Sequence, residues 1–504
     1  MKNLTLINGN RSETPEDDEP EVITSEEYRK KNELTAGLNL NFLDYSDLAT
    51  SQEDKPYIVP LNQPNPLALN LQEREAIRPI RDIAKLAGKK LSASDISAER
   101  AELSLCCELD APKMNIFRRN APLPDGVEID NVGENGARWS VTASGVSEVK
   151  AGGVNIFHRP SYQLPLPTPA EKGDLKLLMP FLNMDHADKH LLVVLMIFTL
   201  ANPKVPTTTY LELFTFGGKG SGKSFLARAI LKPLVDPSIQ SLQAFPGKLD
   251  DLTIAISGSL MSVFDNVRKI TDPQSDHLCR ACSHAFDAKR SLYTNAQQHI
   301  LLLHGFVCIT GIDSSLISQP DLIERTVAIE LKKIPSDRRK SEQDMEAEFN
   351  AVKSQIFRGM LDTMSEIFAA LPYVTVDNPA RMIDFQRYIA AYELVTEMPD
   401  GVLQAHYLDS LNRQMSDGIL DDIVSRAIHD FINYRETFTG TSTALLAQLN
   451  DFTDKDVTSS KYWPQTPVAL GRRLKTIAPK LETAGIILEF TRGKERLISI
   501  SVIV

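Results

Sequence analysis

One eight-residue segment of this chain has the residue types and the spacing to bind phosphate. Residues 217–224 read GGKGSGKS, which fits the pattern G-x-x-x-x-G-K-[ST]. Its glycines let backbone N–H groups turn toward a phosphate, Lys223 would reach the β- and γ-phosphates, and the Ser224 hydroxyl would bind Mg²⁺. The segment therefore predicts that the chain binds ATP or another nucleoside triphosphate.

The flanks of this loop predict a strand before it and a helix after it. Residues 210–216 (YLELFTF) are an aromatic and aliphatic run of strand length, and residues 225–232 (FLARAILK) are rich in helix formers. A glycine-rich turn that contains Lys-Ser by chance would not need these flanks. The predicted nucleotide-binding residues are Gly217, Gly218, Lys219, Gly220, Ser221, Gly222, Lys223, Ser224 and Phe225.

Three further predicted strands follow the loop. Residues 259–265 (SLMSVFD) end in Asp265, about 40 residues after Lys223, where a carboxylate would hold Mg²⁺ together with Ser224. Residues 305–310 (GFVCIT) end at Thr310, and residues 326–331 (TVAIEL) follow Arg325. These strands predict an α/β core with its polar residues at the strand ends.

The order of these parts resembles that of the AAA+ ATPases, the superfamily 3-like helicases among them, and the ATP-binding helicase or primase-associated proteins of phages and integrative elements. The resemblance covers roughly residues 150–500 and is carried by Asp265-Asn266, Thr310-Gly311-Ile312, Pro320-Asp321-Leu322 and Arg325. It implies that Thr310 is sensor 1, that Arg325 is an arginine finger reaching a neighbouring subunit, and that Arg381 is sensor 2. It also implies a homo-oligomer, with a hexamer favoured. For Arg325, an intrachain salt bridge with Asp321 or Glu324 stays open as the alternative.

One position departs from the family pattern. Most members have Asp-Glu where this chain has Asp265-Asn266. Asn266 can orient a water molecule but cannot accept its proton. Either positioning and electrostatics carry phosphoryl transfer, or another acid assists, such as Asp250 or Asp251. The departure predicts slow turnover.

Two basic regions are candidates for DNA contact in a chain of net charge −11. Residues 289–294, 295–298 and 299–303 predict a strand, a turn and a strand, where superfamily 3 helicases carry a DNA-tracking hairpin; a core hairpin is the alternative. There Lys289, Arg290 and Tyr293 would contact DNA. Residues 471–496, with seven Lys/Arg against three Asp/Glu, predict the helix and wing of a winged helix, which binds DNA or protein. Its candidate contacts are Arg472, Arg473, Lys475, Arg492 and Lys494.

A compact group of His277, Cys279, Cys282 and His284 has the residue types of a zinc site. The group falls within one predicted helix, whereas structural zinc sites draw their ligands from separate elements. We therefore favour a helix without metal.

Composition and patterning divide the chain into five regions. We predict an acidic, unordered tail (1–55), an α+β N-terminal domain of unassigned role (56–167), an AAA+ core (168–340), a helical lid (341–435) and a winged-helix domain (436–504). Five cysteines in a chain without a signal peptide predict free thiols and a cytoplasmic protein. The most apolar run, residues 191–201, is too short to cross a membrane.

The favoured function is an ATP-hydrolysing, ring-forming DNA helicase or replication-initiation ATPase of a mobile genetic element, acting on single-stranded or duplex DNA. The alternative is a nucleotide-dependent AAA+ switch that loads or regulates a partner on DNA, or a defence ATPase, without unwinding. A small-molecule kinase is disfavoured, because it would need neither Arg325 nor a winged helix.

Overall fold

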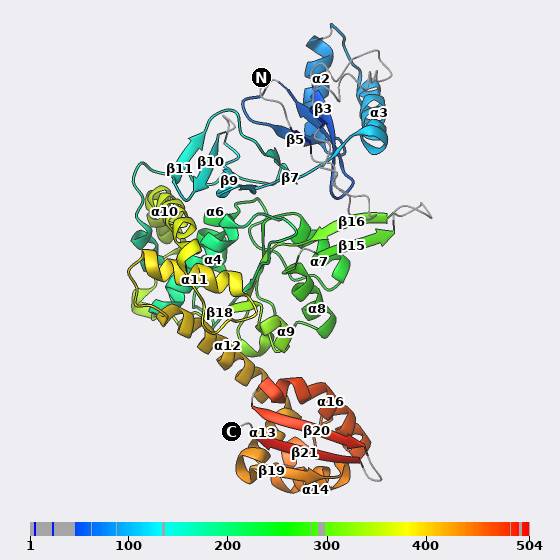
Figure 1. Cartoon of the computed structure of the whole chain (residues 1–504), viewed down its shortest axis with the longest axis vertical. Helices are drawn as coiled ribbons and strands as arrows, with labels where there is room; N and C mark the ends of the chain where they lie inside the picture. The colour runs from blue at the N-terminus through cyan, green and yellow to red at the C-terminus, as the bar shows by residue number, and fades with distance from the viewer. Residues whose placement is uncertain are drawn as a thin grey trace.

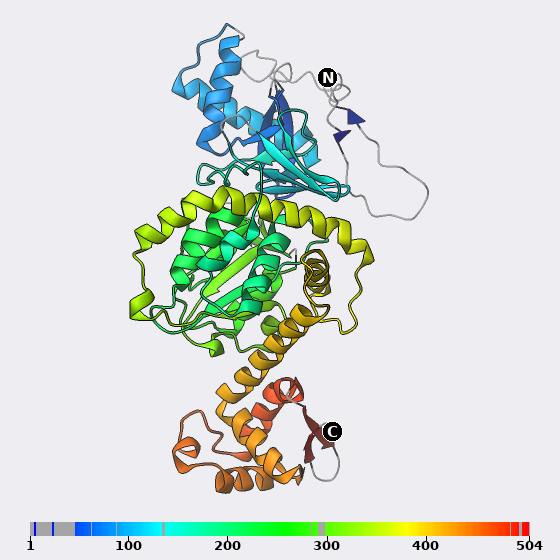
Figure 2. The ribbon, with the colours of Figure 1, turned by 90° about the vertical axis from the view of Figure 1, so that its left-hand side faces the viewer.

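The structure is a computed structural model that describes residues 5–6, 23–24, 46–61, 63–86, 88–133, 137–283, 285–290, 298–483, 485–492 and 496–502. Three blocks follow one another along the long axis of the molecule (Figure 1). N-terminal sheets lie at one end, a parallel sheet with its helices lies in the middle, and a smaller C-terminal block lies at the other end. The last block is reached through α12 (Val402–Asp421), as Figure 2 shows from a second direction.

The central sheet has four parallel strands in the order β14-β17-β13-β18. Their bounds are β13 (Glu212–Phe216), β14 (Met261–Phe264), β17 (Phe306–Thr310) and β18 (Thr326–Glu330). The four predicted strands are all present, because buried parallel strands are continuous apolar runs that the sequence displays. Since the strands are parallel, their carboxyl ends meet at one edge, where ligands bind in open α/β sheets.

Helices cover this sheet and share one hydrophobic core with it. They are α4 (His186–Ala201), α10 (Glu342–Ala370), α11 (Ile383–Val395) and α12, with the short η3 (Leu175–Phe181) and η7 (Leu371–Tyr373). η3 and α4 are two separate elements, because η3 contains Pro180 next to its last residue and Asp185 starts α4 as its N-cap. α10 lies between the central block and the N-terminal sheets (Figure 2), where the Ser365 hydroxyl donates to the Thr142 carbonyl at 2.6 Å.

The N-terminal block contains a six-stranded and a four-stranded sheet. The first has the order β6-β3-β4-β5-β12-β7, with β3 (Ser46–Ser51), β4 (Pro56–Pro60), β5 (Leu67–Asn70), β6 (Lys113–Met114), β7 (Ile116–Phe117) and β12 (Ile156–His158). The second is β11-β10-β9-β8, with β8 (Asn120–Leu123), β9 (Gly126–Asp130), β10 (Arg138–Thr142) and β11 (Gly145–Val149). Two helices, α2 (Ile77–Leu86) and α3 (Ala93–Asp110), pack on the first sheet, after the short η2 (Arg74–Ala76).

The predicted acidic tail over residues 1–55 is wrong at its C-terminal end. β3 pairs with β4 along its length, and all six of its residues are buried. Its apolar residues are few, so it orders through pairing in the sheet rather than through local sequence. Of the first 45 residues, the structure describes only the antiparallel pair β1 (Thr5–Leu6) and β2 (Ile23–Thr24).

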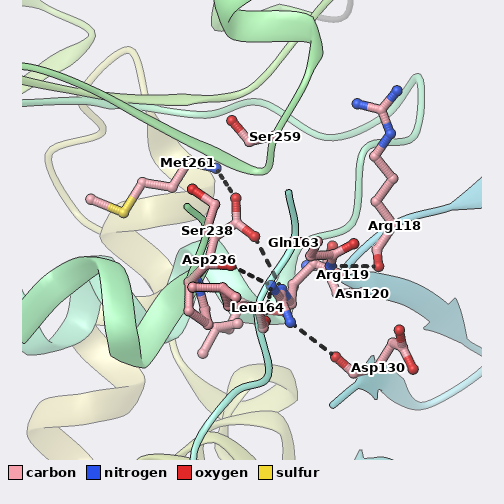
Figure 3. Close-up of polar contacts among 12 residues, drawn as sticks. Arg118, Arg119, Asn120, Asp130, Gln163, Leu164, Asp236, Ser238, Ser259 and Met261 are labelled. Atoms are coloured by element: carbon pink, nitrogen blue, oxygen red, sulfur yellow. Dashed lines mark hydrogen bonds and ion pairs between the residues drawn. The ribbon is translucent and has the colours of Figure 1, made fainter. Parts of the chain in front are cut away.

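A buried arginine joins the four-stranded sheet to the central block (Figure 3). Arg119, just before β8, donates from Nε to Asp236 at 3.1 Å and from its Nη atoms to the carbonyls of Asp130, Leu164 and Pro237. Asp236 also accepts from the backbone N–H of Met261 at 3.0 Å and pairs with Lys232 at 3.5 Å. Burial alone would raise the pKa of Asp236, but the charges of Lys232 and Arg119 hold that pKa below its ordinary value. The contact therefore connects the N-terminal sheets to the start of β14.

The C-terminal block has its own core. Its elements are α13 (Ile423–Arg435), β19 (Thr437–Gly440), α14 (Ser442–Phe452), α15 (Lys455–Thr458), α16 (Pro467–Thr483), β20 (Ile486–Arg492) and β21 (Arg496–Val502), with an antiparallel sheet β19-β21-β20. The predicted start at residue 436 is too late. The apolar face of α13, from Val424 to Ile432, belongs to this core, so the block begins at α13.

A hairpin leaves the central block between β14 and β17, after α7 (Leu249–Ser257) and α8 (Asp272–Ala281). It consists of β15 (Ala285–Arg290) and β16 (Gln298–Leu303), which pair antiparallel. The first strand was predicted at residues 289–294 and begins four residues earlier, because Ala285 and Phe286 pair with the apolar end of β16. Tyr293 lies outside the described residues. Three short helices complete the block: η5 (Ser314–Leu316), α9 (Pro320–Ile323) and η6 (Ser336–Arg338). Among the residues described, no helix is long and apolar enough to cross a membrane.

Candidate functional site

The glycine loop joins the carboxyl end of β13 to a helix that begins with α5 (Lys223–Phe225) and continues through a π-helical segment (Leu226–Leu231) and α6 (Lys232–Val235). Gly217, Gly220 and Gly222 have φ angles of 142°, 80° and 88°, which side chains other than glycine rarely adopt. Lys223 Nζ donates to the carbonyls of Gly217 at 2.7 Å and Gly218 at 3.2 Å. Partial burial lowers the pKa of Lys223, and Asp265 opposes that shift. The ammonium group is therefore held inside the loop.

Asp265, directly after β14, contacts both the glycine loop and the end of the adjacent strand β17. Its Oδ1 accepts from the Ser224 hydroxyl at 3.0 Å and from the Thr310 hydroxyl at 2.5 Å. Thr310 Oγ1 in turn accepts the backbone N–H of Asn266 at 2.9 Å. The structure thus brings together Ser224, Asp265, Asn266 and Thr310, from the loop and two adjacent strands.

Asn266 has a φ of 55°, in the left-handed region. Asparagine tolerates that region better than most residues with a Cβ. The backbone here therefore suits an asparagine at the position where the resemblance to AAA+ ATPases led us to expect Glu. Asp250 and Asp251, the acids suggested as assistants, lie exposed in the first turn of α7.

Residues distant in sequence support the loop and were not predicted. Asn183 Nδ2 donates to the Ser221 carbonyl at 3.0 Å and to the Lys332 carbonyl. Ile334 N donates to the Gly220 carbonyl at 3.3 Å, so the segment after β18 runs alongside the loop. A methyl group on Gly220 would lie 3.2 Å from Arg339 Nη2. Arg339 therefore places a guanidinium at the loop, and only the run of basic residues at 338–340 hinted at it.

Arg325 and Arg381 share one acidic partner, Asp321. Arg325 is nearly buried and bonds Asp321 Oδ1 at 2.6 Å, which is the intrachain salt bridge kept open as the alternative to a finger. Arg381 is 44% exposed and pairs with Asp321 at 2.7 Å and Glu324 at 2.9 Å. The described contacts of Arg381 are with the residues around α9, not with the glycine loop.

The described candidate DNA contacts lie on three elements, β15 in the hairpin and α16 and β20 in the C-terminal block. Lys289 and Arg290 occupy the distal part of β15, in register with His299 and Gln298. On α16, Arg472 and Lys475 are exposed, whereas Arg473 forms a salt bridge with Asp422 at the start of α13. Arg492 ends β20, and Lys494 lies outside the described residues.

The structure uses the His and Cys residues of α8 in packing. Cys279 and Cys282 are buried, and burial is the main cause that raises the pKa of both thiols. His277 Nε2 lies 2.9 Å from the Thr253 hydroxyl. Within the described part of the chain, which excludes His284, no group of three or more His, Cys, Asp or Glu is arranged to hold a metal.

Comparison with known proteins gives two matches to one family, in order along the chain. Residues 175–417 match the actinomycete integrative conjugative element replication protein, AICE RepA, and residues 424–503 match the AICE RepA C-terminal domain. The second match begins within two residues of α13. No curated protein matches the chain.

Two solved structures are also similar. The apo structure of the NrS-1 C-terminal region is 11% identical, with a TM-score of 0.43, and covers 91% of this chain and 97% of its own. A RuvB mutant from Thermotoga maritima is 16% identical, with a TM-score of 0.22, and covers 64% and 94%. At TM-scores this low, neither similarity assigns a fold. Across nearly two thirds of its length, the chain matches the replication proteins of actinomycete integrative conjugative elements.

Proposed function

We propose that this chain is an oligomeric replication ATPase that acts on DNA, as a helicase or as an initiation ATPase. The observation that carries the proposal is the convergence of Ser224 and Thr310 on one oxygen of Asp265, beside a glycine loop at the carboxyl edge of a parallel sheet. The match to replication proteins of integrative conjugative elements supports DNA as the partner.

The loop and its neighbours fit ATP with Mg²⁺. The Ser224 hydroxyl and the Asp265 carboxylate are hard oxygen donors 3.0 Å apart, the ligand type that Mg²⁺ takes in proteins. When bound, Mg²⁺ neutralises charge on the β- and γ-phosphates. Lys223 would exchange loop carbonyls for phosphate oxygens, and Arg339 would add a second cation. Asn266 would orient the attacking water, with its backbone held by Thr310.

Two parts of the fold would turn nucleotide state into movement. α10 is tied to the helix after the loop, because Arg228 pairs with Glu342 at 2.9 Å and Glu346 at 2.7 Å. We infer that α10 to α12 form the lid, and that the C-terminal block is a winged helix that docks on DNA through α16. The continuous path from α12 to α13 would carry lid motion to that block.

Subunits would share the ATP site. Arg325 is satisfied within the chain in this conformation, so to act as a finger it would have to leave Asp321. Mixing Arg325→Ala subunits with Lys223→Ala subunits should restore part of the ATPase rate, since some interfaces then combine an intact loop with an intact finger. Mixing Arg381→Ala subunits with Lys223→Ala subunits tests whether Arg381, which is more exposed, is the arginine finger instead. No recovery with either, in mixed rings verified by native mass spectrometry, would argue against a finger acting between subunits.

One assay distinguishes a helicase from a nucleotide-dependent switch that loads or regulates a partner on DNA. ATP hydrolysis and strand separation are measured on a forked DNA, with Asp265→Ala as the control that loses hydrolysis. DNA-stimulated hydrolysis with unwinding supports the helicase. Nucleotide-dependent binding of DNA or a partner without unwinding supports the loader or regulator. Hydrolysis that no DNA stimulates, together with binding of DNA and partner that does not depend on nucleotide, would contradict both.

A further inference from the structure

Helix α2 of the N-terminal block presents a row of cations outward, and no role has been assigned to this block. Arg74, Arg78, Arg81 and Lys85 are all exposed. Their spacing of four, three and four residues puts them on one face of the helical turn formed by η2 and α2. The opposite face, with Ala76, Ile80, Ile83 and Ala84, is buried in the core. Figure 1 places α2 at the end of the molecule away from the C-terminal block.

This row is not explained by the stability of the folded chain. Arg74 and Arg78 lie at the N-terminal end of the helix, where the helix dipole disfavours positive charge. Cations three and four residues apart repel one another. Within the described residues, the ion pairs of the row reduce to Arg78 with Asp82, 3.9 Å apart and with side chains 92% and 61% exposed. A pair so exposed contributes little.

Two acids, Glu75 and Asp82, lie in the same helical segment, and the other neighbouring acids are engaged elsewhere or lie on another helix. Glu73, just before the row, bonds His158 at 3.3 Å and the Asn70 amide at 3.4 Å. The exposed acids of α3 include Glu102 and Glu108. With four cations against Glu75 and Asp82, residues 74–85 keep a net positive charge on a chain whose net charge is −11.

We propose that the outer face of α2 binds the phosphate backbone of DNA, as a third DNA contact separate from the hairpin and from α16. Eleven residues at about 1.5 Å each set the row at roughly 16 Å, which spans about five phosphates of one duplex strand. A single cation row without aromatic side chains fits backbone contact rather than base reading. The choice of DNA over other polyanions rests on the proposed replication function.

The test removes Arg74, Arg81 and Lys85, which form no ion pair with the residues that the structure describes, and keeps the helix. Arg74→Gln/Arg81→Gln/Lys85→Gln retains good helix formers. A control variant, Lys150→Gln/Lys172→Gln/Lys176→Gln, removes the same charge from other exposed positions. Affinity of the full-length proteins for single-stranded and duplex DNA of unrelated sequence is measured from 50 to 300 mM salt. Far-UV circular dichroism verifies the fold, and ATP affinity is measured on the same samples.

The α2 variant should lower the salt slope on single strands by about two and weaken binding at 0.1 M salt on the order of 100-fold. The control should stay near wild type, and ATP affinity should be unchanged in both. A slope in the α2 variant equal to that of the control overturns the inference, while wild-type DNA binding leaves the proposed function standing. Loss of self-association instead of DNA binding would assign the face to a second copy of the chain and also overturn it. A wild-type chain that binds no DNA would refute both proposals.

Discussion

Replacing Asp236 with alanine should destabilise the contact between the N-terminal sheets and the central block. The loss should be larger than that caused by substituting any exposed residue. Asp236 is the carboxylate partner of Arg119, which is fully buried, and of Lys232, which is 2% exposed. Without it, two buried cations lose their counter-charge and the Met261 N–H loses its acceptor. Removing one partner of a buried ion pair costs about 3–5 kcal/mol. At about 2–4 °C per kcal/mol, the unfolding midpoint of this region should fall by about 6–20 °C.

The two tryptophans allow this loss to be localised. Trp139 lies in β10 of the N-terminal block, and Trp463 is buried in the C-terminal core. In a Trp463→Phe background, fluorescence of Trp139 reports unfolding of the N-terminal side alone. Asp82→Ala, which removes the exposed partner of Arg78, is the matched control and should change stability by less than about 0.5 kcal/mol. Equal midpoints for Asp236→Ala and Asp82→Ala would refute the role given to the buried network.

The pH dependence follows from the direction of the Asp236 pKa. Because that pKa is held below its ordinary value, the ionised carboxylate stabilises the folded state above the unfolded pKa, about 3.9. This stabilisation is lost as pH falls through the folded pKa. The difference between wild type and Asp236→Ala should therefore be constant from pH 5 to 8 and shrink only below about pH 4.

Three substitutions test single contacts of the ATP and DNA sites. Asn266→Gly keeps the positive φ and the backbone N–H that bonds Thr310 but removes the side-chain amide. ATP should still bind, while kcat falls on the order of 100-fold. An unchanged kcat would exclude Asn266 from positioning water. Arg339→Ala should weaken ATPγS binding about 10-fold by calorimetry, since a charge-assisted contact is lost; equal affinity would leave Arg339 a packing residue. Arg472→Ala should weaken duplex binding more than Arg473→Ala, because Arg473 is already paired with Asp422; the reverse order would contradict the exposed face assigned to α16.

Local patterns predicted the central sheet and the residues at its edge. The strands ending at Asp265 and Thr310 are apolar runs, and the glycine loop has a fixed spacing, so each signal lies within a few neighbouring residues. The contact between Thr310 and Asp265 follows from the strand order, because β17 lies between β13 and β14 and therefore ends beside Asp265. Without the parallel sheet, the spacing alone would not place these groups on one oxygen.

Tertiary contacts decided what the sequence left unassigned. Asn183 has no local signal and Arg339 only a run of basic residues around it, because the segments before α4 and after β18 reach the loop only in the folded chain. The ion pair of Arg325 depends on α9 holding Asp321 one turn away. α13 is amphipathic in either the lid or the C-terminal block, and only packing against α14 and α16 assigns it to the second.

The most direct test of the central claim is the affinity of Lys223→Ala for ATP in the presence of Mg²⁺, beside Lys219→Ala as the matched control. Lys219 is exposed on the same loop, whereas the Lys223 ammonium bonds the carbonyls of Gly217 and Gly218 inside the loop. We predict that Lys223→Ala weakens ATP binding on the order of 100-fold while Lys219→Ala binds nearly as wild type. Wild-type affinity in Lys223→Ala would contradict the assignment of this loop as the ATP site.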